Sequence, residues 1–189
     1  KNLYYVDMEL VKKLESLNIL QKIAIVLVGT LLLTISAKIK VPFYPVPMTM
    51  QTFVVVLIGI TLGWKLGLIT ILMYLLEGAM GLPVFAGTPE KGIGISYMIG
   101  PTGGYLVGFI TSVFIAGFVN LNKNIFIRFF LISLAIFAIY ITGVPWLAYL
   151  AGWEIAYVWG IKNFVLAEAL KISILALSTK KLLKFRKFI

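Results

Sequence analysis

Long apolar stretches, interrupted at short intervals by glycine, proline or lysine, are the feature that most limits how this chain can fold. A transmembrane helix needs about 20 predominantly apolar residues. Of the 189 residues, 61% are hydrophobic and 13% are charged, so there is room for roughly six short spans and for no separate nucleotide-binding or catalytic domain. The sequence therefore predicts an all-α membrane protein with six transmembrane helices.

The six predicted spans are separated by connections of different character. Their approximate ranges are 23–37, 49–62, 66–80, 104–119, 125–142 and 164–177. Residues 63–67 contain two glycines, a tryptophan and a lysine, which predicts a tight turn at the membrane interface. Gly143 and Pro145 are expected to end the fifth span. Residues 1–22 predict a cytoplasmic amphipathic segment on the membrane surface, and residues 23–189 form the membrane domain.

Lysine and arginine are unevenly distributed between the two predicted sides of the membrane. If both termini lie on one side, 12 of the 17 cations lie there and four lie on the other, with Lys171 inside the sixth span. Because cytoplasmic loops are enriched in these residues, both termini are predicted to be cytoplasmic. The irregular connections 38–51, 78–103 and 143–162 then lie on the outer face. The net charge of +10 has the same explanation and does not call for nucleic acid as a partner.

Residues 74–105 are the most irregular part of the sequence, with eight glycines and three prolines. Such a density rules out one continuous helix, since glycine frees the backbone and proline removes a donor. Irregular backbone at membrane depth survives only where protein or a watery cavity covers it. The residues alone leave two alternatives open, a binding loop or a plain outer connection.

Two charges in the sixth span, Glu168 and Lys171, are three residues apart and point to one face of the helix. Because a charge in hydrocarbon costs roughly 2.5–3.5 kcal/mol on insertion scales, both are expected to face the bundle interior. They form either the polar end of a ligand pocket, which Glu77 would complete, or an ion pair that only joins helices. Aromatic residues of the outer connections are either pocket walls or an interfacial belt, namely Phe43, Tyr44, Phe85, Tyr97, Tyr105, Trp146 and Tyr149.

The chain lacks the groups on which most enzymes depend. It contains no Cys and no His, which excludes thiolate chemistry, imidazole bases and the commonest zinc ligands. The P-loop motif of ATPases is also absent. We therefore expect no catalytic residues, no metal site and no cofactor. A secondary transporter that uses Glu77 and Glu168 as proton carriers remains an alternative, and an intramembrane enzyme is a more remote one.

Three blocks of the sequence are distinctive in their order and spacing: PVPMTMQT at 45–52, GLPVFAG at 81–87 and GPTGGYLVGF at 100–109. They resemble the signature blocks of the BioY family, the biotin-binding membrane subunits (S components) of energy-coupling factor (ECF) transporters. The resemblance covers roughly residues 40–175. Where the family usually carries an aspartate followed three residues later by a lysine, this chain has Glu168 and Lys171. The resemblance implies the six-helix S-component fold, with the ligand pocket near the outer face.

The resemblance also implies a set of biotin-binding residues. Glu168 and Lys171 would satisfy the N–H and carbonyl groups of the ureido ring. Phe85 and Tyr97 would contact the thiophane ring and the aliphatic tail, and Lys91 would meet the carboxylate of the tail. The full expected set is Gln51, Glu77, Phe85, Ala86, Gly87, Lys91, Tyr97, Gly100, Thr102, Gly103, Tyr105, Glu168 and Lys171.

Because the chain has no ATPase of its own, the resemblance implies partners for uphill uptake. These are an ECF coupling transmembrane subunit and two ATP-binding subunits, although some family members are thought to work alone. S components expose an Ala-x-x-x-Ala face of the first span to the coupling subunit, and here Ala24 is followed by Val28. The expected surroundings are the lipid bilayer of a prokaryotic inner or plasma membrane, with biotin as the substrate.

Overall fold

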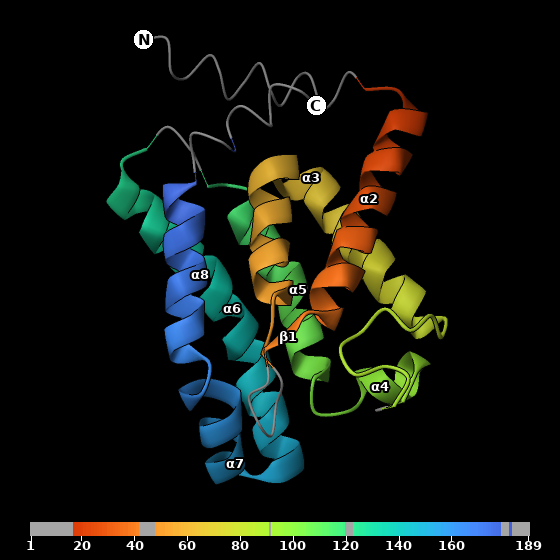
Figure 1. Ribbon diagram of the computed structural model, residues 1–189, viewed down its shortest axis with the longest axis vertical. Coiled ribbons are helices and arrows are strands. Elements are labelled where there is room, and N and C mark those ends of the chain that lie inside the picture. Colours follow the sequence, from red (N-terminus) through yellow and green to blue (C-terminus); the bar gives the residue numbers. More distant parts are fainter. Residues whose placement is uncertain (1–16, 42–47, 91, 120–122, 179–181, 183–189) are drawn as a thin grey trace.

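The computed structural model describes residues 17–41, 48–90, 92–119, 123–178 and 182, and within them the chain is almost entirely helical (Figure 1). The elements are α2 (Ile19–Lys38), β1 (Lys40–Val41), β2 (Met48–Thr49), α3 (Gln51–Ala79), α4 (Gly94–Met98), α5 (Gly103–Ala116), α6 (Ile125–Ala151), α7 (Trp153–Tyr157), the π-helix η1 (Val158–Lys162) and α8 (Val165–Leu177). At Gly63 the backbone of α3 leaves helical geometry, with φ 73° and ψ 175°. Counting the two halves of α3 separately, α2, α3, α5, α6 and α8 provide the six predicted helices.

The irregular connections gather at one end of the bundle. Figure 1 shows β1, α4 and α7 in its lower half, while α2 begins and α8 ends at the opposite end. Strands β1 and β2 form a two-residue antiparallel ladder in the first connection, which joins α2 to α3. The kink at Gly63 lies at the other end, so α3 runs up through the bundle and back again. Three connections that are far apart in sequence can therefore contribute to one site.

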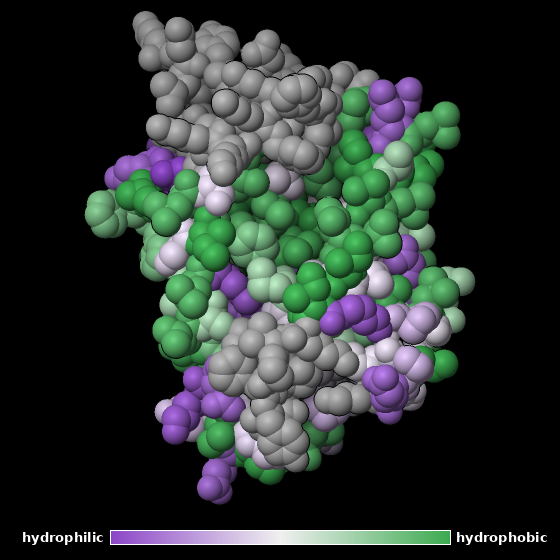
Figure 2. Space-filling model, viewed as in Figure 1, coloured by the Kyte–Doolittle hydropathy of each residue, from purple (hydrophilic) through white to green (hydrophobic). Residues whose placement is uncertain are grey.

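The surface of the bundle is suited to a bilayer. Helices α2, α3 and α6 are long and apolar enough to span a membrane, and α5 is a shorter apolar helix. Figure 2 shows a broad apolar band across the middle of the face in view, with most hydrophilic residues toward its ends. Large apolar side chains that a soluble protein would bury are exposed along α2 and α6, including Leu31 and Phe137. Such a band matches a multi-pass membrane protein.

The expectation that the fifth span ends at Gly143 and Pro145 is wrong. Helix α6 continues through both residues to Ala151, and Gly152 ends it with a φ of 89°. Proline is tolerated within membrane helices because neighbouring groups compensate for the backbone bond that it removes. Here Gly143 packs directly against the ring of Tyr105, and a Cβ at this position would lie 2.4 Å from that ring. Tertiary packing against α5 therefore outweighs the local tendency of this segment to break.

Two other boundaries differ from the sequence-based expectation. Helix α2 begins at Ile19 rather than at residue 23, because Asn18 and Gln21 form a capping box there. Residues 1–16 of the expected amphipathic segment lie outside the described residues. The predicted interfacial turn is confirmed at Gly63, but the residues that follow it are already helical.

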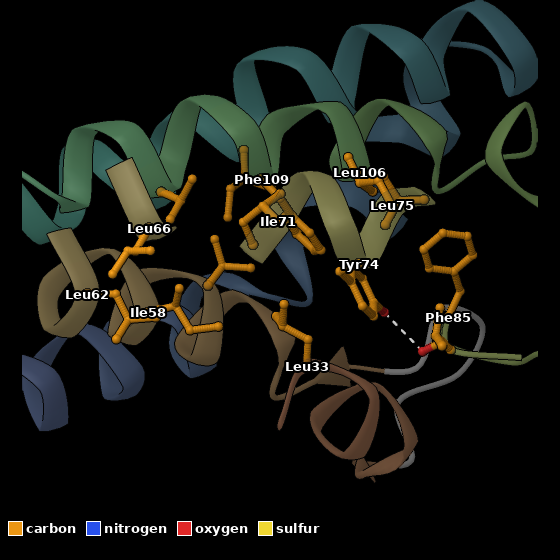
Figure 3. Packing of buried hydrophobic residues seen from close by; sticks show 14 of the residues in the cluster. Leu33, Ile58, Leu62, Leu66, Ile71, Tyr74, Leu75, Phe85, Leu106 and Phe109 are labelled. Carbon is orange, nitrogen blue, oxygen red and sulfur yellow. Dashed lines mark hydrogen bonds between the residues drawn. The ribbon is translucent and has the colours of Figure 1, made fainter. Parts of the chain in front are cut away.

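The largest buried cluster joins α2, α3, α5 and the loop between α3 and α4. Figure 3 shows Leu33, Ile58, Leu66, Ile71 and Phe109 interdigitating in this cluster. At one end of it, buried Tyr74 meets Phe85 edge-on, with ring centroids 5.4 Å apart. The core therefore ends in aromatic residues on the side where the irregular connections gather.

Candidate ligand-binding site

Glu168 and Lys171 form a buried ion pair on α8. Lys171 Nζ lies 2.9 Å from Glu168 Oε1. Lys171 is 4% exposed and Glu168 is 6% exposed. Glu168 is in the first turn of α8, where a negative charge interacts favourably with the helix dipole. The prediction that both residues face the bundle interior is confirmed.

Two threonines near the start of α3 complete this polar cluster. Lys171 Nζ donates to the carbonyl of Thr49 and to Thr52 Oγ1, each at 2.9 Å. Thr52 Oγ1 in turn donates to the two carboxylate oxygens of Glu168, at 2.9 and 3.1 Å. With Glu168 as its third acceptor, the ammonium group of Lys171 has one acceptor for each of its three N–H bonds. Lys171 therefore orients and neutralises the carboxylate of Glu168.

A cavity of about 120 Å³ opens beside Glu168. Residues from β2, α3, α4, α5, α6, η1 and α8 and from the loops next to them surround it, and most of their side chains are apolar or aromatic. The lining residues are Thr49, Gln51, Thr52, Ala86, Tyr97, Pro101, Thr102, Tyr105, Leu106, Phe109, Ile139, Tyr140, Leu147, Trp159, Phe164 and Glu168. One carboxylate in an otherwise largely apolar cavity fits a ligand site in which apolar walls hold the ligand and a few polar groups fix its orientation.

The loop between α3 and α4 forms one wall of the cavity at Ala86. Tyr97 Oη donates to the carbonyl of Ala86 at 2.5 Å, and its ring stacks on Phe85 with centroids 5.1 Å apart. Burial raises the pKa of the Tyr97 hydroxyl above its ordinary value of 10.0, and a hydrogen bond with Thr102 opposes this shift only in part. Tyr97 therefore stays protonated at physiological pH and remains a donor to the loop.

A second contact ties this loop to the floor of the cavity. Gln51 Nε2 donates to Tyr74 Oη at 2.8 Å, and Tyr74 Oη donates to the carbonyl of Val84 at 2.9 Å (Figure 3). Both side chains are buried. Because Gln51 lines the cavity and Val84 precedes its wall, the relay fixes the position of the wall relative to α3.

Comparison with known proteins identifies the family of this chain. The sequence matches the model of the BioY family over residues 8–188. The chain belongs to the BioY family. A probable biotin transporter BioY from Pyrococcus horikoshii is 35% identical over 162 residues, which cover 86% of this chain and 96% of that protein. A biotin transporter BioY from Thermotoga maritima is 46% identical over 97 residues, covering 51% and 56% of the two chains.

The fold of this BioY-family chain is also similar to a solved structure. The crystal structure of the S component for biotin from an ECF-type ABC transporter superposes with a TM-score of 0.73 and covers 89% of this chain and 92% of that one, at 22% sequence identity. The similarity confirms the expected six-helix S-component fold.

Six of the residues that the sequence suggested line the cavity of this BioY-family chain: Gln51, Ala86, Tyr97, Thr102, Tyr105 and Glu168. Phe85 and Lys171 lie directly behind the lining, the first under Tyr97 and the second under Glu168. Gly87 has a φ of 79° and shapes the wall next to Ala86.

Two glycines of the expected set shape the turn before α5 and do not line the cavity. The carbonyl of Gly100 accepts from Trp146 Nε1 at 2.9 Å and also from the backbone N–H of Gly103. A Cβ on Gly103 would lie 1.8 Å from the carbonyl oxygen of Met98, so the turn needs glycine at this position. These residues position Thr102, which does line the cavity.

The remaining expected residues lie either outside the cavity lining or outside the part of the chain that the structure describes. Glu77 lies half-buried near the end of α3 and is not among the lining residues. Tyr149 is 85% exposed, so its proposed role as a pocket wall is wrong, because its position on α6 faces away from the bundle. Lys91, Phe43 and Tyr44 lie outside the described residues.

Several lining residues of this BioY-family site were not identified from the sequence. Thr49 and Thr52 belong to the block PVPMTMQT, and polar residues at the start of a membrane helix were a usable signal. Tyr140, Trp159 and Phe164 come from α6, η1 and the residue before α8. Their sequence pattern does not distinguish them from lipid-facing aromatic residues, so only their packing reveals them.

Proposed function

We propose that this chain is the biotin-binding S component of an ECF-type transporter and that biotin binds in the cavity beside Glu168. The observation that carries this proposal is the single buried carboxylate at the end of an aromatic cavity, in a member of a family whose curated relatives are named biotin transporters. As expected from the sequence, a chain of this family is a transport protein and not an enzyme.

The chemistry of the cavity suits the ureido ring of biotin. The ring offers two N–H donors and one carbonyl acceptor, and a carboxylate provides about four lone-pair sites. Lys171 and Thr52 occupy some of the lone-pair sites of the Glu168 carboxylate. The remaining lone-pair sites face the cavity. Gln51 lines the same space and supplies a neutral N–H donor for the carbonyl, while Tyr140 donates to Glu168. Lys171 reaches that carbonyl only if it exchanges its contact with Thr49 or Thr52.

The size of the cavity indicates that the wall moves when biotin binds. The cavity of about 120 Å³ is smaller than the roughly 300–1,000 Å³ of typical small-molecule sites. The apolar surfaces of Tyr97, Tyr105 and Trp159 line the cavity and would contact the thiophane ring and tail.

Replacing Tyr97 with phenylalanine is expected to weaken biotin binding about three- to tenfold. The change keeps the ring stacked on Phe85 but removes the donor to the carbonyl of Ala86, and a net hydrogen bond contributes about 0.5–1.5 kcal/mol. Titration of biotin into the purified variant measures the effect. Tyr149→Phe, which removes an exposed hydroxyl, is the control and should bind like the wild type.

The coupling partners form the second part of the proposal. Helix α2 carries an exposed apolar face, and an apolar groove of about 550 Å³ lies between it and the first half of α3. Ala24 and Val28, the two positions expected at the subunit contact, both line this groove. An ECF coupling subunit docked there, with two ATP-binding subunits, would supply the energy that this chain lacks. The distribution of cations supports an orientation with both termini in the cytoplasm and the biotin site near the outer face, in the inner or plasma membrane of a prokaryotic cell.

Equilibrium binding of biotin to the purified chain in detergent tests the proposed function. We expect stoichiometric binding with nanomolar affinity, and no competition from lipoate, which has a similar acidic tail but no ureido group. A folded sample that fails to bind biotin would overturn the proposal. If uptake into vesicles without any ATPase followed an imposed proton gradient, the secondary-transporter alternative would replace it.

A further inference from the structure

Lys38, the last residue of α2, contacts the loop that forms the Ala86 wall and does not itself line the cavity. Its Nζ donates to the carbonyl of Phe85 at 3.0 Å, to the carbonyl of Thr88 at 2.9 Å and to Thr88 Oγ1 at 2.9 Å. Thr88 Oγ1 also donates to the carbonyl of Phe85 at 2.7 Å. The oxygens of residues 85 and 88 thus form a cup around the ammonium group, and neither residue is among those that line the cavity.

These contacts are charge-assisted, and such hydrogen bonds are stronger than neutral ones. They complete a set of three attachments of the same short loop, each from a different helix. Tyr74 of α3 holds the carbonyl of Val84, Tyr97 of α4 holds the carbonyl of Ala86, and Lys38 of α2 holds the residues on both sides of Ala86. Ala86 is the loop residue that lines the cavity.

Of these three attachments, the one from α2 is the best suited to release. Tyr74 is fully buried and Tyr97 is 5% exposed, so moving either hydroxyl disturbs the core. Lys38 lies at an exposed helix end, and its flexible side chain can leave the cup while both backbones stay folded. A shift of α2 would pull on the loop through Lys38 alone among these three residues.

We propose that Lys38 is a positioning residue that holds the Ala86 wall closed over bound ligand and transmits movement of α2 to that wall. The proposal rests on the proposed function, because it takes biotin as the ligand that the wall retains. It gives α2 a second role: one end of the helix is fixed to the binding loop, so a displacement of the helix changes how easily the cavity opens.

The test compares Lys38→Met, which keeps the length of the side chain and removes its charge, with Lys38→Arg, which keeps the donors. Lys38→Met is expected to speed the release of radiolabelled biotin, chased with unlabelled biotin, at least fivefold, and Lys38→Arg to restore most of the wild-type retention. Lys123→Met, which removes an exposed lysine before α6, is the control for loss of one charge. The apparent melting temperature should be the same in all four proteins.

Hydrogen exchange of peptides covering residues 82–90 in the ligand-free chain provides the second readout. We expect faster exchange in Lys38→Met and in Thr88→Val, and no further increase in the double variant, because both changes empty the same cup. Unchanged exchange in Lys38→Met, or a biotin release rate within twofold of the wild type, would overturn the proposal. An effect confined to biotin association would also overturn it, since that is the signature of simple attraction of an anion. If the wild type itself binds no biotin, the proposed function fails, and the exchange data still decide whether Lys38 holds the loop.

Discussion

Replacing Lys171 with methionine should weaken biotin binding at least tenfold, which corresponds to about 1.4 kcal/mol. The variant keeps the length of the side chain but leaves the carboxylate of Glu168 buried, with Thr52 as its remaining partner in this cluster. Removing one partner of a buried ion pair costs about 3–5 kcal/mol, so the carboxylate is expected to move away from the geometry that binds a ureido ring. Titration calorimetry with biotin measures the loss.

A double-variant cycle separates a role in binding from a role in folding. Glu168→Gln together with Lys171→Met removes both charges, so its apparent melting temperature should recover relative to Lys171→Met alone. Biotin binding should not recover, because the amide of glutamine cannot replace the carboxylate as an acceptor for two N–H groups. If Lys171→Met bound biotin with wild-type affinity, Glu168 and Lys171 would be an ion pair that only joins helices. Lys123→Met serves again as the control for loss of an exposed charge.

Replacing Gly104 with valine should destabilise the whole bundle and lower Tm by more than about 5 °C. A Cβ at this position would lie 2.3 Å from Trp146 Cβ and 2.6 Å from the carbonyl oxygen of Thr142. Neither atom is the far end of a flexible side chain, so α5 and α6 would have to separate. Overpacking costs about 1–3 kcal/mol or more, and for a chain of this size each kcal/mol changes Tm by roughly 2–4 °C.

The matched control for Gly104→Val is Val107→Leu, which adds a methylene on the exposed face of the same helix. Val107 is 54% exposed, so this substitution should leave Tm unchanged. Gly104→Ala should fall between the two, because it adds the clashing Cβ without the further methyl groups. Equal melting temperatures for Gly104→Val and Val107→Leu would show that α5 and α6 do not depend on this close contact.

The candidate site was partly predictable because charges in an apolar helix are conspicuous. Glu168 and Lys171 stand out in the sixth span, and the cost of burying them requires an interior position. The different roles of Glu168 and Lys171 in the site did not follow from the sequence. Thr49 and Thr52 approach from a segment more than 100 residues away, and their contacts show that Glu168 faces the cavity while Lys171 supports it.

The sequence by itself determined the class of the protein, the number of its membrane helices and which of its connections are irregular. These properties depend on the length of apolar stretches, on the distribution of cations and on the positions of glycine and proline, all of which are local. Only the tertiary structure decided that α6 continues through Pro145, that Trp159 lines the cavity while Tyr149 faces outward, and that Lys38 reaches the loop beside Ala86. The physical reason is that proline and aromatic residues have the same local preferences in either role, and the packing of distant helices against them selects between the roles.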